Sequence, residues 1–307
     1  MTILIDDAIF RLQAHGGIST LWRKLLPYLQ PLLQDIECPT TYLSTYYAVP
    51  PASLRSISVV YDCIAEHYPA IGAQHPDATK KRAAIAAADG VVTISEWTAT
   101  DVRGLTDKPV FVAHCGTDIQ RASPAQVAAF KARYGIEKPY VLIVGRRGLY
   151  KNVGVIYQAW RFFNAQDNYQ VLAIGGEDRT IADNQFAQQY HWQHAHLDDS
   201  DLASAYTGAA MVVYPSLFEG FGLPVLEAMA CGTPVVCGER SAIPEFAEDS
   251  PYYANVFLPL SVADAMNQAL QPDFERQQTA MHRAQLYTWE RMAQHMSQAI
   301  KDIPHDE

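Results

Sequence analysis

Short apolar runs alternate with glycine-containing loops and with segments of helical periodicity along most of the chain. The runs are rich in Val, Ile and Leu without strict alternation, which is typical of strands buried on both faces of a parallel sheet. Strand and helix in regular alternation predict an α/β fold. The strands expected from this pattern are 2–7, 58–62, 140–144, 170–174, 210–214 and 235–237.

The segment that follows the strand at 210–214 carries the most specific pattern. Gly220 and Gly222 permit close backbone approaches, and Pro224 suits the first turn of a helix, which we expect over 224–231. In a parallel sheet this loop lies at the carboxyl end of its strand, where ligands bind. The N–H groups of the helix start also favour a phosphate there.

Two carboxylates, Glu219 and Glu227, border this expected phosphate site. Carboxylates beside an anion site are suited to accept hydrogen bonds from neutral hydroxyls, such as those of a sugar and a ribose. Taken singly, either glutamate is also compatible with a solvated position or a favourable charge in the first turn of the helix, because glutamates are mostly exposed. The pair together with the glycines favours a nucleotide-sugar site.

Basic residues follow the strand expected at 140–144 and its terminal Gly145. Arg binds phosphate through two parallel hydrogen bonds and Lys acts as a mobile point charge. The tip of the first strand of a Rossmann-like domain is where such groups meet a diphosphate. Each basic residue alone remains compatible with a solvated loop charge.

The segment 216–230 closely resembles the motif of retaining glycosyltransferases of family 4, and the resemblance extends over most of the C-terminal half. It implies the GT-B fold, with two Rossmann-like domains facing across a cleft. It further implies that Glu219 meets the transferred sugar and Glu227 the ribose of the donor. The other donor-binding residues that it implies in this half are Gly145, Gly220, Phe221, Gly222 and Leu223.

The same resemblance assigns the diphosphate ligands. Members of the family carry Arg or Thr after the glycine and Lys six positions after it, which implies Arg146 and Lys151 here as catalytic groups together with Glu219. Arg147 stays open. The family's usual Arg just before the Lys is Tyr150 in this chain, so one anion contact is absent.

The N-terminal half repeats the arrangement of strand, glycine loop and helix, with Gly16 and Gly17 before a helix expected over 18–33. The resemblance implies that these glycines approach the donor phosphates or the acceptor. Without it, an ordinary flexible turn explains a Gly-Gly pair equally well.

Many members of the family carry His-Asp where this chain has Tyr61 and Asp62. The role of that His passes to Tyr61, to Asp62 or to no side chain. Asp62 is a catalytic candidate that orients the acceptor or the sugar, although a cap on the following turn is equally plausible. Ser95 follows a strand at 90–94 that matches the family, and is expected first as a helix cap and second as an acceptor-side residue.

The resemblance predicts an N-terminal acceptor-side domain over 1–120, a nucleotide-sugar-binding domain over 121–285, and a final helix within 286–307 that crosses back to the first domain. The N-terminal domain is expected to be reduced, since about 25 residues separate its first helix from the strand at 58–62. The last helix has one apolar face, formed by Trp289, Met292, Met296 and Ile300.

Composition limits the partners. The formal net charge of −10 argues against broad nucleic-acid binding and strong adhesion to anionic lipid. No apolar run is long enough to span a bilayer, and the start lacks a signal-peptide pattern. The five cysteines show no paired spacing and are expected to be reduced. We therefore expect a cytoplasmic protein with at most peripheral contact at the inner face of a membrane.

Two clusters are interpreted as ordinary surface features. His191, His194 and His196 match no zinc pattern, so we expect a loop without a metal. The run 80–82 opens a helix and is interpreted as a solvated basic face, although contact with a membrane or a charged acceptor stays open.

These observations lead to one predicted function. The chain is expected to move a hexose-like sugar from a UDP- or GDP-linked donor to a hydroxyl of a saccharide or lipid-linked acceptor, with retention, without a metal or other cofactor, in cell-surface polysaccharide or glycoconjugate assembly. Two alternatives remain: a GT-B phosphorylase or epimerase, and a nucleotide-sugar-binding partner subunit with little activity.

Overall fold

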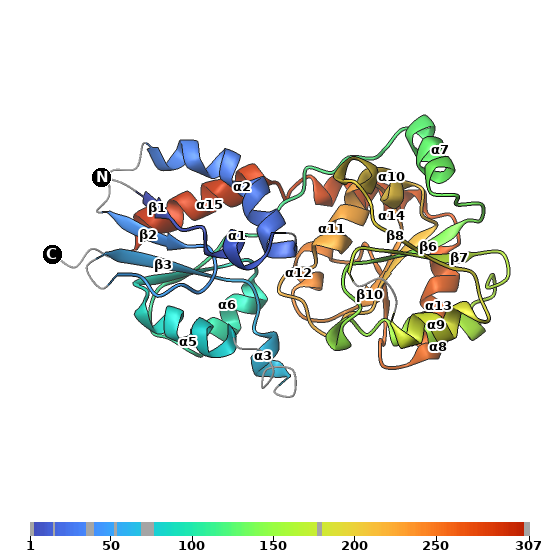
Figure 1. Ribbon diagram of the computed structural model, residues 1–307, viewed down its shortest axis with the longest axis horizontal. Helices are drawn as coiled ribbons and strands as arrows, with labels where there is room; N and C mark the ends of the chain where they lie inside the picture. The colour runs from blue at the N-terminus through green and yellow to red at the C-terminus, as the bar shows by residue number, and fades with distance from the viewer. Residues whose placement is uncertain are drawn as a thin grey trace. The chain divides into compact units, whose positions relative to one another are not determined.

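The computed structural model describes residues 3–14, 16–34, 40–51, 54–68, 77–176 and 180–303. The chain divides into two compact units, the first formed by Met1–Gly116 with Tyr287–Glu307 and the second by Thr117–Leu286. Each described unit contains one sheet whose paired strands all run parallel (Figure 1). The predicted class of two Rossmann-like α/β domains is thereby confirmed.

The first unit holds a five-stranded sheet in which the strands lie in chain order. The strands are β1 (Ile3–Ile5), β2 (Thr41–Ser44), β3 (Arg55–Val60), β4 (Gly90–Thr93) and β5 (Val110–Val112). Its helices are α1 (Ala8–Leu12), α2 (Gly17–Gln34), α3 (Ile64–His67), α5 (Asp77–Ala87), α6 (Glu96–Arg103) and α15 (Trp289–Asp302). Figure 1 shows α2 and α15 on one face of this sheet and α5 and α6 on the other.

Strand β2 is absent from the expected elements. It is four residues long, and its polar residues Thr41 and Ser44 are buried, so no apolar run marks it. Thr2 of the first expected strand, and the chain between α2 and residue 40, which includes Cys38, lie outside the described residues.

The final helix α15 packs against α2 within the first unit. The four residues of its expected apolar face are all buried. They meet an apolar face of α2 that includes Trp22, Leu25 and Leu29, each fully buried. Removing this much apolar surface from water is what holds the end of the chain to the first unit.

The second unit holds a six-stranded sheet in the order β11-β10-β9-β6-β7-β8. The strands are β6 (Tyr140–Val144), β7 (Gln170–Ile174), β8 (Trp192–Ala195), β9 (Met211–Tyr214), β10 (Val235–Gly238) and β11 (Tyr252–Ala254). The chain winds outward from β6 through β7 to β8 and then returns to the other side of β6 at β9. The strand order therefore reverses between β6 and β9, which is where doubly wound sheets bind ligands.

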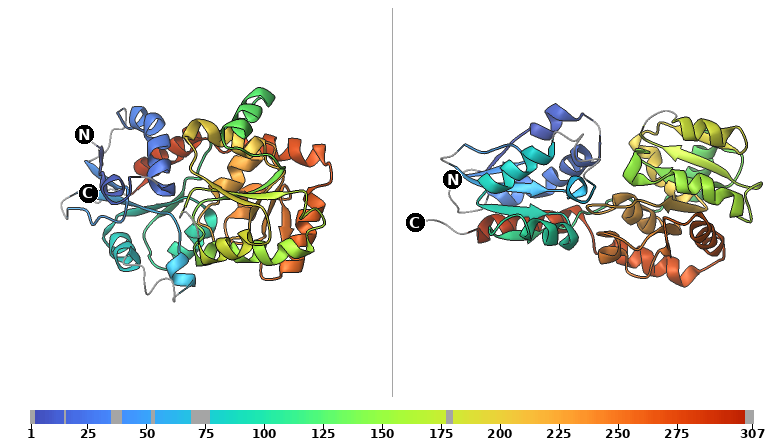
Figure 2. Two further views of the ribbon diagram at one scale, coloured as in Figure 1. Left: turned by 45° about the vertical axis from the view of Figure 1, so that its right-hand side comes forward. Right: turned by 90° about the horizontal axis from the view of Figure 1, so that it is seen from below.

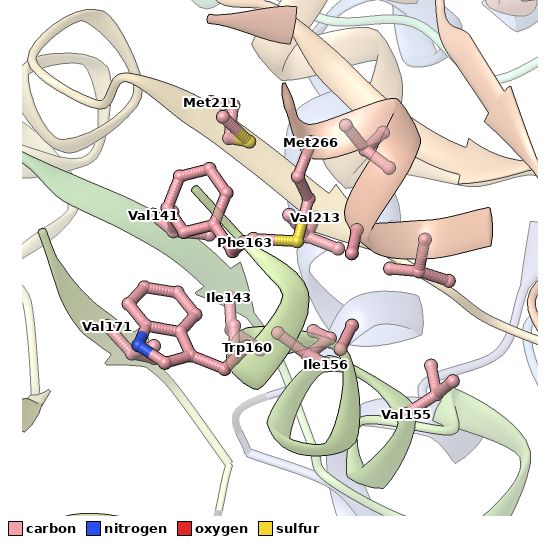
Figure 3. Packing of buried hydrophobic residues seen from close by; sticks show 14 of the residues in the cluster. Val141, Ile143, Val155, Ile156, Trp160, Phe163, Val171, Met211, Val213 and Met266 are labelled. Carbon is pink, nitrogen blue, oxygen red and sulfur yellow. The ribbon is translucent and has the colours of Figure 1, made fainter. Parts of the chain in front are cut away.

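Helices cover both faces of the second sheet (Figure 2). Those on one face are α8 (Gly154–Ala159), α9 (Ile181–Ala187) and α13 (Pro259–Ala269). Those on the other are α7 (Pro124–Arg133), α10 (Leu202–Thr207), α11 (Leu223–Ala230), α12 (Ile243–Ala247) and α14 (Phe274–Ala284). Figure 3 shows the core beneath α8 and α13, where Trp160 and Met266 pack against Val141, Val171 and Val213.

Two expectations for surface clusters are wrong. His194 lies within strand β8 and not in a loop. The strand is anchored by the buried residues Trp192 and Ala195, and the histidine side chain between them is half-buried. Lys81 is not part of a solvated face: its side chain is 4% exposed, and its ammonium lies 2.6 Å from a carboxylate oxygen of Glu66. Lys80 and Arg82 are exposed, as expected.

Among the described residues, no helix combines the length and the apolar character that crossing a membrane requires. The four cysteines that the structure describes are buried free thiols.

Candidate active site

The candidate site lies at the carboxyl ends of β6 and β9, where the strand order reverses. Gly145 follows β6 with φ of 90°, and Gly222 precedes α11 with φ of 111°, conformations that L side chains rarely adopt. A Cβ at Gly222 would lie 3.1 Å from Cγ1 of Ile243. Glycine therefore lets the loop turn sharply into the helix and pack closely against α12.

Lys151 and Glu219 meet between these two strand ends. The ammonium of Lys151 lies 2.7 Å from Oε1 of Glu219 and donates to the hydroxyl of Tyr214 at 2.6 Å. The Lys151 side chain is 14% exposed and that of Glu219 is 10% exposed. The two residues are 68 positions apart, so the fold and not local sequence brings this ion pair together.

Tyr214, the last residue of β9, stays neutral in this cluster. Burial and the adjacent Glu219 carboxylate hold the pKa of its phenol well above the ordinary value. The hydroxyl therefore remains protonated at neutral pH and accepts the hydrogen bond from Lys151 without adding charge. The ring also lies under the ammonium, with the nitrogen 4.9 Å from the ring centroid.

Ser241 positions the backbone of Glu219. The Glu219 N–H donates to Oγ of Ser241 at 2.9 Å, and both residues are buried. Ser241 has φ of 50°, which is unfavourable for a residue with a Cβ. Residues held in such conformations concentrate at functional sites, where the surrounding structure over-determines them.

Glu227, in the second turn of α11, accepts a hydrogen bond from a buried tyrosine. The hydroxyl of Tyr206 on α10 lies 2.5 Å from Oε2 of Glu227. Burial and the Glu227 charge raise the pKa of Tyr206 well above its ordinary value, so the phenol donates and the carboxylate accepts. Each of the two predicted glutamates is thus oriented by one buried phenol.

The loop between the glutamates is fixed by packing. Gly220 is buried, and Phe221 is 3% exposed and stacks on Phe246 of α12 with ring centroids 4.6 Å apart. Leu223 is the first residue of α11, so its amide belongs to the set of N–H groups that a helix leaves without intrahelical partners.

The two arginines after Gly145 differ in exposure and in their partners. Arg146 is exposed, and its side chain has no hydrogen-bond or ion-pair partner among the residues that the structure describes. Arg147 forms an ion pair of 2.9 Å with Asp183 of α9, and the two side chains are 1% and 0% exposed. Its guanidinium also donates to the Gly175 carbonyl at 3.1 Å. Arg147 therefore ties the loop after β6 to α9.

In the first unit, Gly16 and Gly17 lie at the start of α2. The Gly16 carbonyl accepts a hydrogen bond from the Ser19 hydroxyl at 3.0 Å, and a Cβ at Gly16 would collide with the Gln13 side chain. A Cβ at Gly17 would meet nothing within 4 Å. A Cβ at Gly17 is therefore not excluded by the described residues, in contrast to Gly16.

Tyr61 lies in the core of the first unit, at 3% exposure. Its hydroxyl accepts a hydrogen bond from the Trp22 indole at 2.6 Å and donates to the Thr45 carbonyl at 2.5 Å. Both bonds join elements of the unit, from α2 to the ends of β2 and β3. The phenol therefore fastens α2 to the carboxyl edge of the sheet.

Asp62 caps the turn that follows β3. Its Oδ1 accepts a hydrogen bond from the Ile64 N–H at 3.1 Å, and its backbone carbonyl accepts from the buried ammonium of Lys81 at 2.9 Å. Ser95 is the N-cap of α6, where its Oγ accepts from the Thr98 N–H at 3.1 Å, and it is fully buried. The expected capping role of Ser95 is confirmed.

Several residues of this site were not anticipated from the sequence. Tyr206, Tyr214, Ser241 and Lys81 each contact a predicted residue from a distant part of the chain.

The histidine cluster remains without a metal-like arrangement. The described part of the chain contains no group of three His, Cys, Asp or Glu residues placed to hold a metal ion. Nε2 of His194 lies 3.1 Å from the Gly175 carbonyl, and its ring stacks beside Trp192.

Comparison with known proteins identifies the family to which the segment that carries this site is similar. The family model for glycosyl transferases group 1 matches residues 127–284, which include β6 to β11 and both glutamates. The O-antigen chain mannosyltransferase B of Escherichia coli is 27% identical over 217 residues, covering 65% of this chain and 57% of that protein. The alpha-maltose-1-phosphate synthase of Mycolicibacterium smegmatis is 31% identical over 188 residues, covering 55% of this chain and 48% of that protein. The matches therefore span about half the length of these relatives.

Solved structures share the fold across nearly the whole chain. Anabaena HepE in complex with UDP-glucose has a TM-score of 0.76 at 14% identity and covers 97% of this chain and 98% of its own. Sucrose-phosphate synthase of Thermosynechococcus elongatus has a TM-score of 0.70 at 20% identity, covering 93% of this chain and 79% of its own. These likenesses confirm the GT-B fold. The family match covers more than half of the chain, and the protein therefore belongs to the glycosyl transferases group 1 family.

Proposed function

We propose that this protein is a retaining glycosyltransferase that moves a hexose-like sugar from a nucleotide diphosphate sugar to an acceptor hydroxyl. The observation that carries the proposal is the contact of Lys151 with Glu219 and Tyr214 where the strand order reverses, next to the start of α11. A cation, a carboxylate and helix N–H groups at one strand edge match the phosphate and the hydroxyls of such a donor.

Stabilisation of the leaving diphosphate is the main catalytic task in this scheme. Negative charge grows on the diphosphate as the bond to the sugar breaks, and groups already oriented at that point lower the barrier. Lys151 and Arg146 supply positive charge, and the first N–H groups of α11, around Leu223, supply donors. An ammonium has three N–H bonds, so Lys151 can bind a phosphate oxygen while it still contacts Glu219.

The two glutamates hold the donor in register. Glu219 accepts hydrogen bonds from the sugar hydroxyls, and Glu227 accepts them from the ribose. Tyr206 binds the Glu227 carboxylate and Ser241 binds the Glu219 backbone N–H, and both restraints lower the entropy cost of binding the donor in one orientation. Gly145 and Gly220 complete the loops around the donor, and Gly16, Gly17 and Asp62 are kept as candidates of the first unit for contacts to the donor or the acceptor.

Retention of anomeric configuration and independence from a metal are further parts of the proposal. Retention rests on the resemblance of the glutamate motif to family 4. Metal independence rests on charge: two cations and a helix start at the diphosphate replace the neutralisation that a divalent cation supplies in other transferases. Activity that persists in excess EDTA is the expected outcome.

The names of the similar proteins guide the choice of substrates. The relatives include a mannosyltransferase of O-antigen chains and a maltose-1-phosphate synthase, and HepE structures hold UDP or UDP-glucose. We accordingly propose a UDP- or GDP-linked hexose as donor and a saccharide or lipid-linked saccharide as acceptor, in polysaccharide or glycoconjugate assembly. Action in the cytoplasm, at most peripheral to a membrane, remains a prediction of the composition.

The test is turnover in vitro with UDP-glucose, UDP-galactose, GDP-mannose and similar donors, with EDTA present and with saccharide acceptors supplied. The wild type is expected to transfer or slowly hydrolyse at least one donor, with the product anomer read by NMR. Lys151→Ala is expected to lower turnover severely while the circular dichroism spectrum stays near wild type, with a lower melting temperature because the nearly buried Glu219 loses its ion-pair partner. Donor binding without hydrolysis or transfer across the panel would favour a binding subunit, and near-normal turnover in Lys151→Ala would contradict the assigned role.

A further inference from the structure

A pocket lies at the opposite end of the same sheet, where its strands begin. Its volume is about 290 Å³, and residues that immediately precede strands line it, including Tyr169 before β7, Ala210 before β9 and Pro234 before β10. The donor residues follow the carboxyl ends of β6 and β9. The pocket is therefore separated from the donor site by the length of the strands, although both belong to one compact unit.

The lining is rich in hydrogen-bonding side chains. Arg121, Gln271 and Gln277 all border the pocket, and none of their side chains has a partner among the residues that the structure describes. Thr207 and Thr233 also border the pocket, with hydroxyls that already bind within the protein: that of Thr207 accepts from the Ala122 N–H, and that of Thr233 donates to the Tyr206 carbonyl. No carboxylate lies among the described lining residues, so the guanidinium of Arg121 is not neutralised there.

Three helices end at this pocket. Thr207 is the last residue of α10, Ala269 is the last of α13, and Gly232 lies just beyond α11. The last carbonyls of a helix carry the negative end of its dipole. Several of them already accept one hydrogen bond here, as Ala228 does from the Thr233 N–H and Met229 from the Gly232 N–H, and each carbonyl oxygen has a second lone pair. The pocket therefore combines hydrogen-bond donors, on Arg121 and the glutamines, with the negative ends of three helix dipoles.

This combination selects one class of ligand. A phosphate or carboxylate would meet three negative helix ends, and a cation would meet Arg121. A hydroxyl group both donates and accepts, so it can satisfy carbonyls and guanidinium in the same space. A ligand that carries several hydroxyls on a compact ring is a saccharide, and the exposed part of the Tyr169 ring offers a surface for an apolar ring face.

The backbone beside Arg121 is held in place before any ligand binds. The Ala122 N–H donates to Oγ1 of Thr207 at 2.9 Å, which fixes the backbone next to Arg121. Gly232 has φ of 69°, and a Cβ there would lie 3.1 Å from Nη1 of Arg121. Glycine thus leaves the room that the guanidinium occupies. Tyr169 is fixed by an edge-to-face contact with Phe163, with ring centroids 5.6 Å apart.

We propose that this pocket is a second saccharide-binding site, separate from the donor site and sized for one or two sugar rings. A volume near 290 Å³ lies at the small end of the range of ligand sites. The proposal does not depend on the donor or on the proposed reaction, because it follows from the lining alone.

The experiment uses methionine methyl groups as reporters. A Cβ at Gly232 would lie 2.9 Å from Sδ of Met281, so the Met281 methyl is close to the pocket, while Met292 and Met296 belong to the first unit. Maltose and methyl α-mannoside are titrated into protein with ¹³C-labelled methionine methyls, and Met281→Leu identifies the signal. We expect a saturable shift of Met281 with a dissociation constant in the millimolar range and no shift of the two first-unit signals.

Variants then assign the site. Arg121→Ala is expected to weaken this binding at least about tenfold, since it removes a charged donor. Arg161→Ala, which removes another exposed arginine of the same unit, is expected to leave it unchanged. Lys151→Ala is also expected to retain it, because that residue belongs to the donor site.

Three results would overturn the proposal: no saturable Met281 shift with either sugar, equal affinity in Arg121→Ala, or a Met281 shift caused by inorganic phosphate that blocks the sugars. Saccharide binding that persists in a protein without any transferase activity would leave this site intact and count against the proposed function alone.

Discussion

Ser241 gives the sharpest test of how the structure holds Glu219, because its two features act in opposite directions on stability. Its hydroxyl accepts the buried N–H of Glu219 at 2.9 Å, while its φ of 50° strains the backbone. Ser241→Ala removes the acceptor and keeps the strain. An unsatisfied buried donor costs about 1–3 kcal/mol, and that is the expected loss in free energy of unfolding.

Ser241→Gly removes the same acceptor but relieves the strain, which is worth about 1–2 kcal/mol for an L residue in this region. Glycine also costs about 0.5–1 kcal/mol of additional backbone entropy. The Gly variant should therefore be more stable than the Ala variant by up to about 1.5 kcal/mol. In both variants the Glu219 backbone loses its anchor, so we expect kcat/KM for the donor to fall by a similar factor of about ten, which corresponds to about 1.4 kcal/mol.

Urea unfolding and steady-state kinetics measure the two effects separately. Ser250→Ala is the matched control, since Ser250 is also buried but its Oγ has no hydrogen-bond partner within the described chain. It should be nearly neutral in both assays. Equal destabilisation of the Gly and Ala variants would refute the strain argument, and wild-type kinetics in both would refute the positioning of Glu219.

Three further substitutions test other contacts. Tyr206→Phe removes the hydrogen bond to the ribose-side glutamate, so the donor KM should rise roughly tenfold with little change in kcat; an unchanged KM would contradict that role. Arg147→Ala leaves Asp183 as an uncompensated buried charge and should cost about 3–5 kcal/mol in urea unfolding, and a loss below about 1 kcal/mol would show that the pair is not a buried anchor. Tyr61→Phe leaves the Trp22 indole without its acceptor and should cost about 1–3 kcal/mol while the acceptor KM stays constant; a raised acceptor KM in a stable variant would return Tyr61 to the acceptor site.

The donor side was accessible from the sequence because its chemistry is local. The glycines, Pro224 and the two glutamates lie within a single segment of strand, loop and helix, and buried parallel strands leave clear apolar runs. The residues that orient the glutamates are not local. Ser241 lies 22 positions from Glu219, and Tyr206 lies 21 positions from Glu227, on an element whose pattern shows a buried helix residue and nothing more.

Charged residues were the least predictable from sequence alone. Arg147 and Lys81 both stand in runs of basic residues that suggest a solvated surface, yet each pairs with one carboxylate in a nearly closed environment. Burial of a charge is decided by whether a partner from elsewhere in the fold reaches it, and no local pattern contains that partner. Strand β2 was not predicted for a related reason: its buried Thr and Ser residues leave no apolar run in the sequence.

The most direct test of the central claim is calorimetric titration of UDP and GDP into the wild type, Lys151→Ala and Glu227→Gln, with EDTA present throughout. The account predicts that one nucleotide binds the wild type without metal. Lys151→Ala should weaken that binding by about 10- to 100-fold, because it removes a charge-assisted contact and leaves the Glu219 carboxylate unpaired beside the diphosphate. Glu227→Gln should weaken it as well. Equal affinity in all three proteins, or binding that requires a divalent cation, would contradict the account.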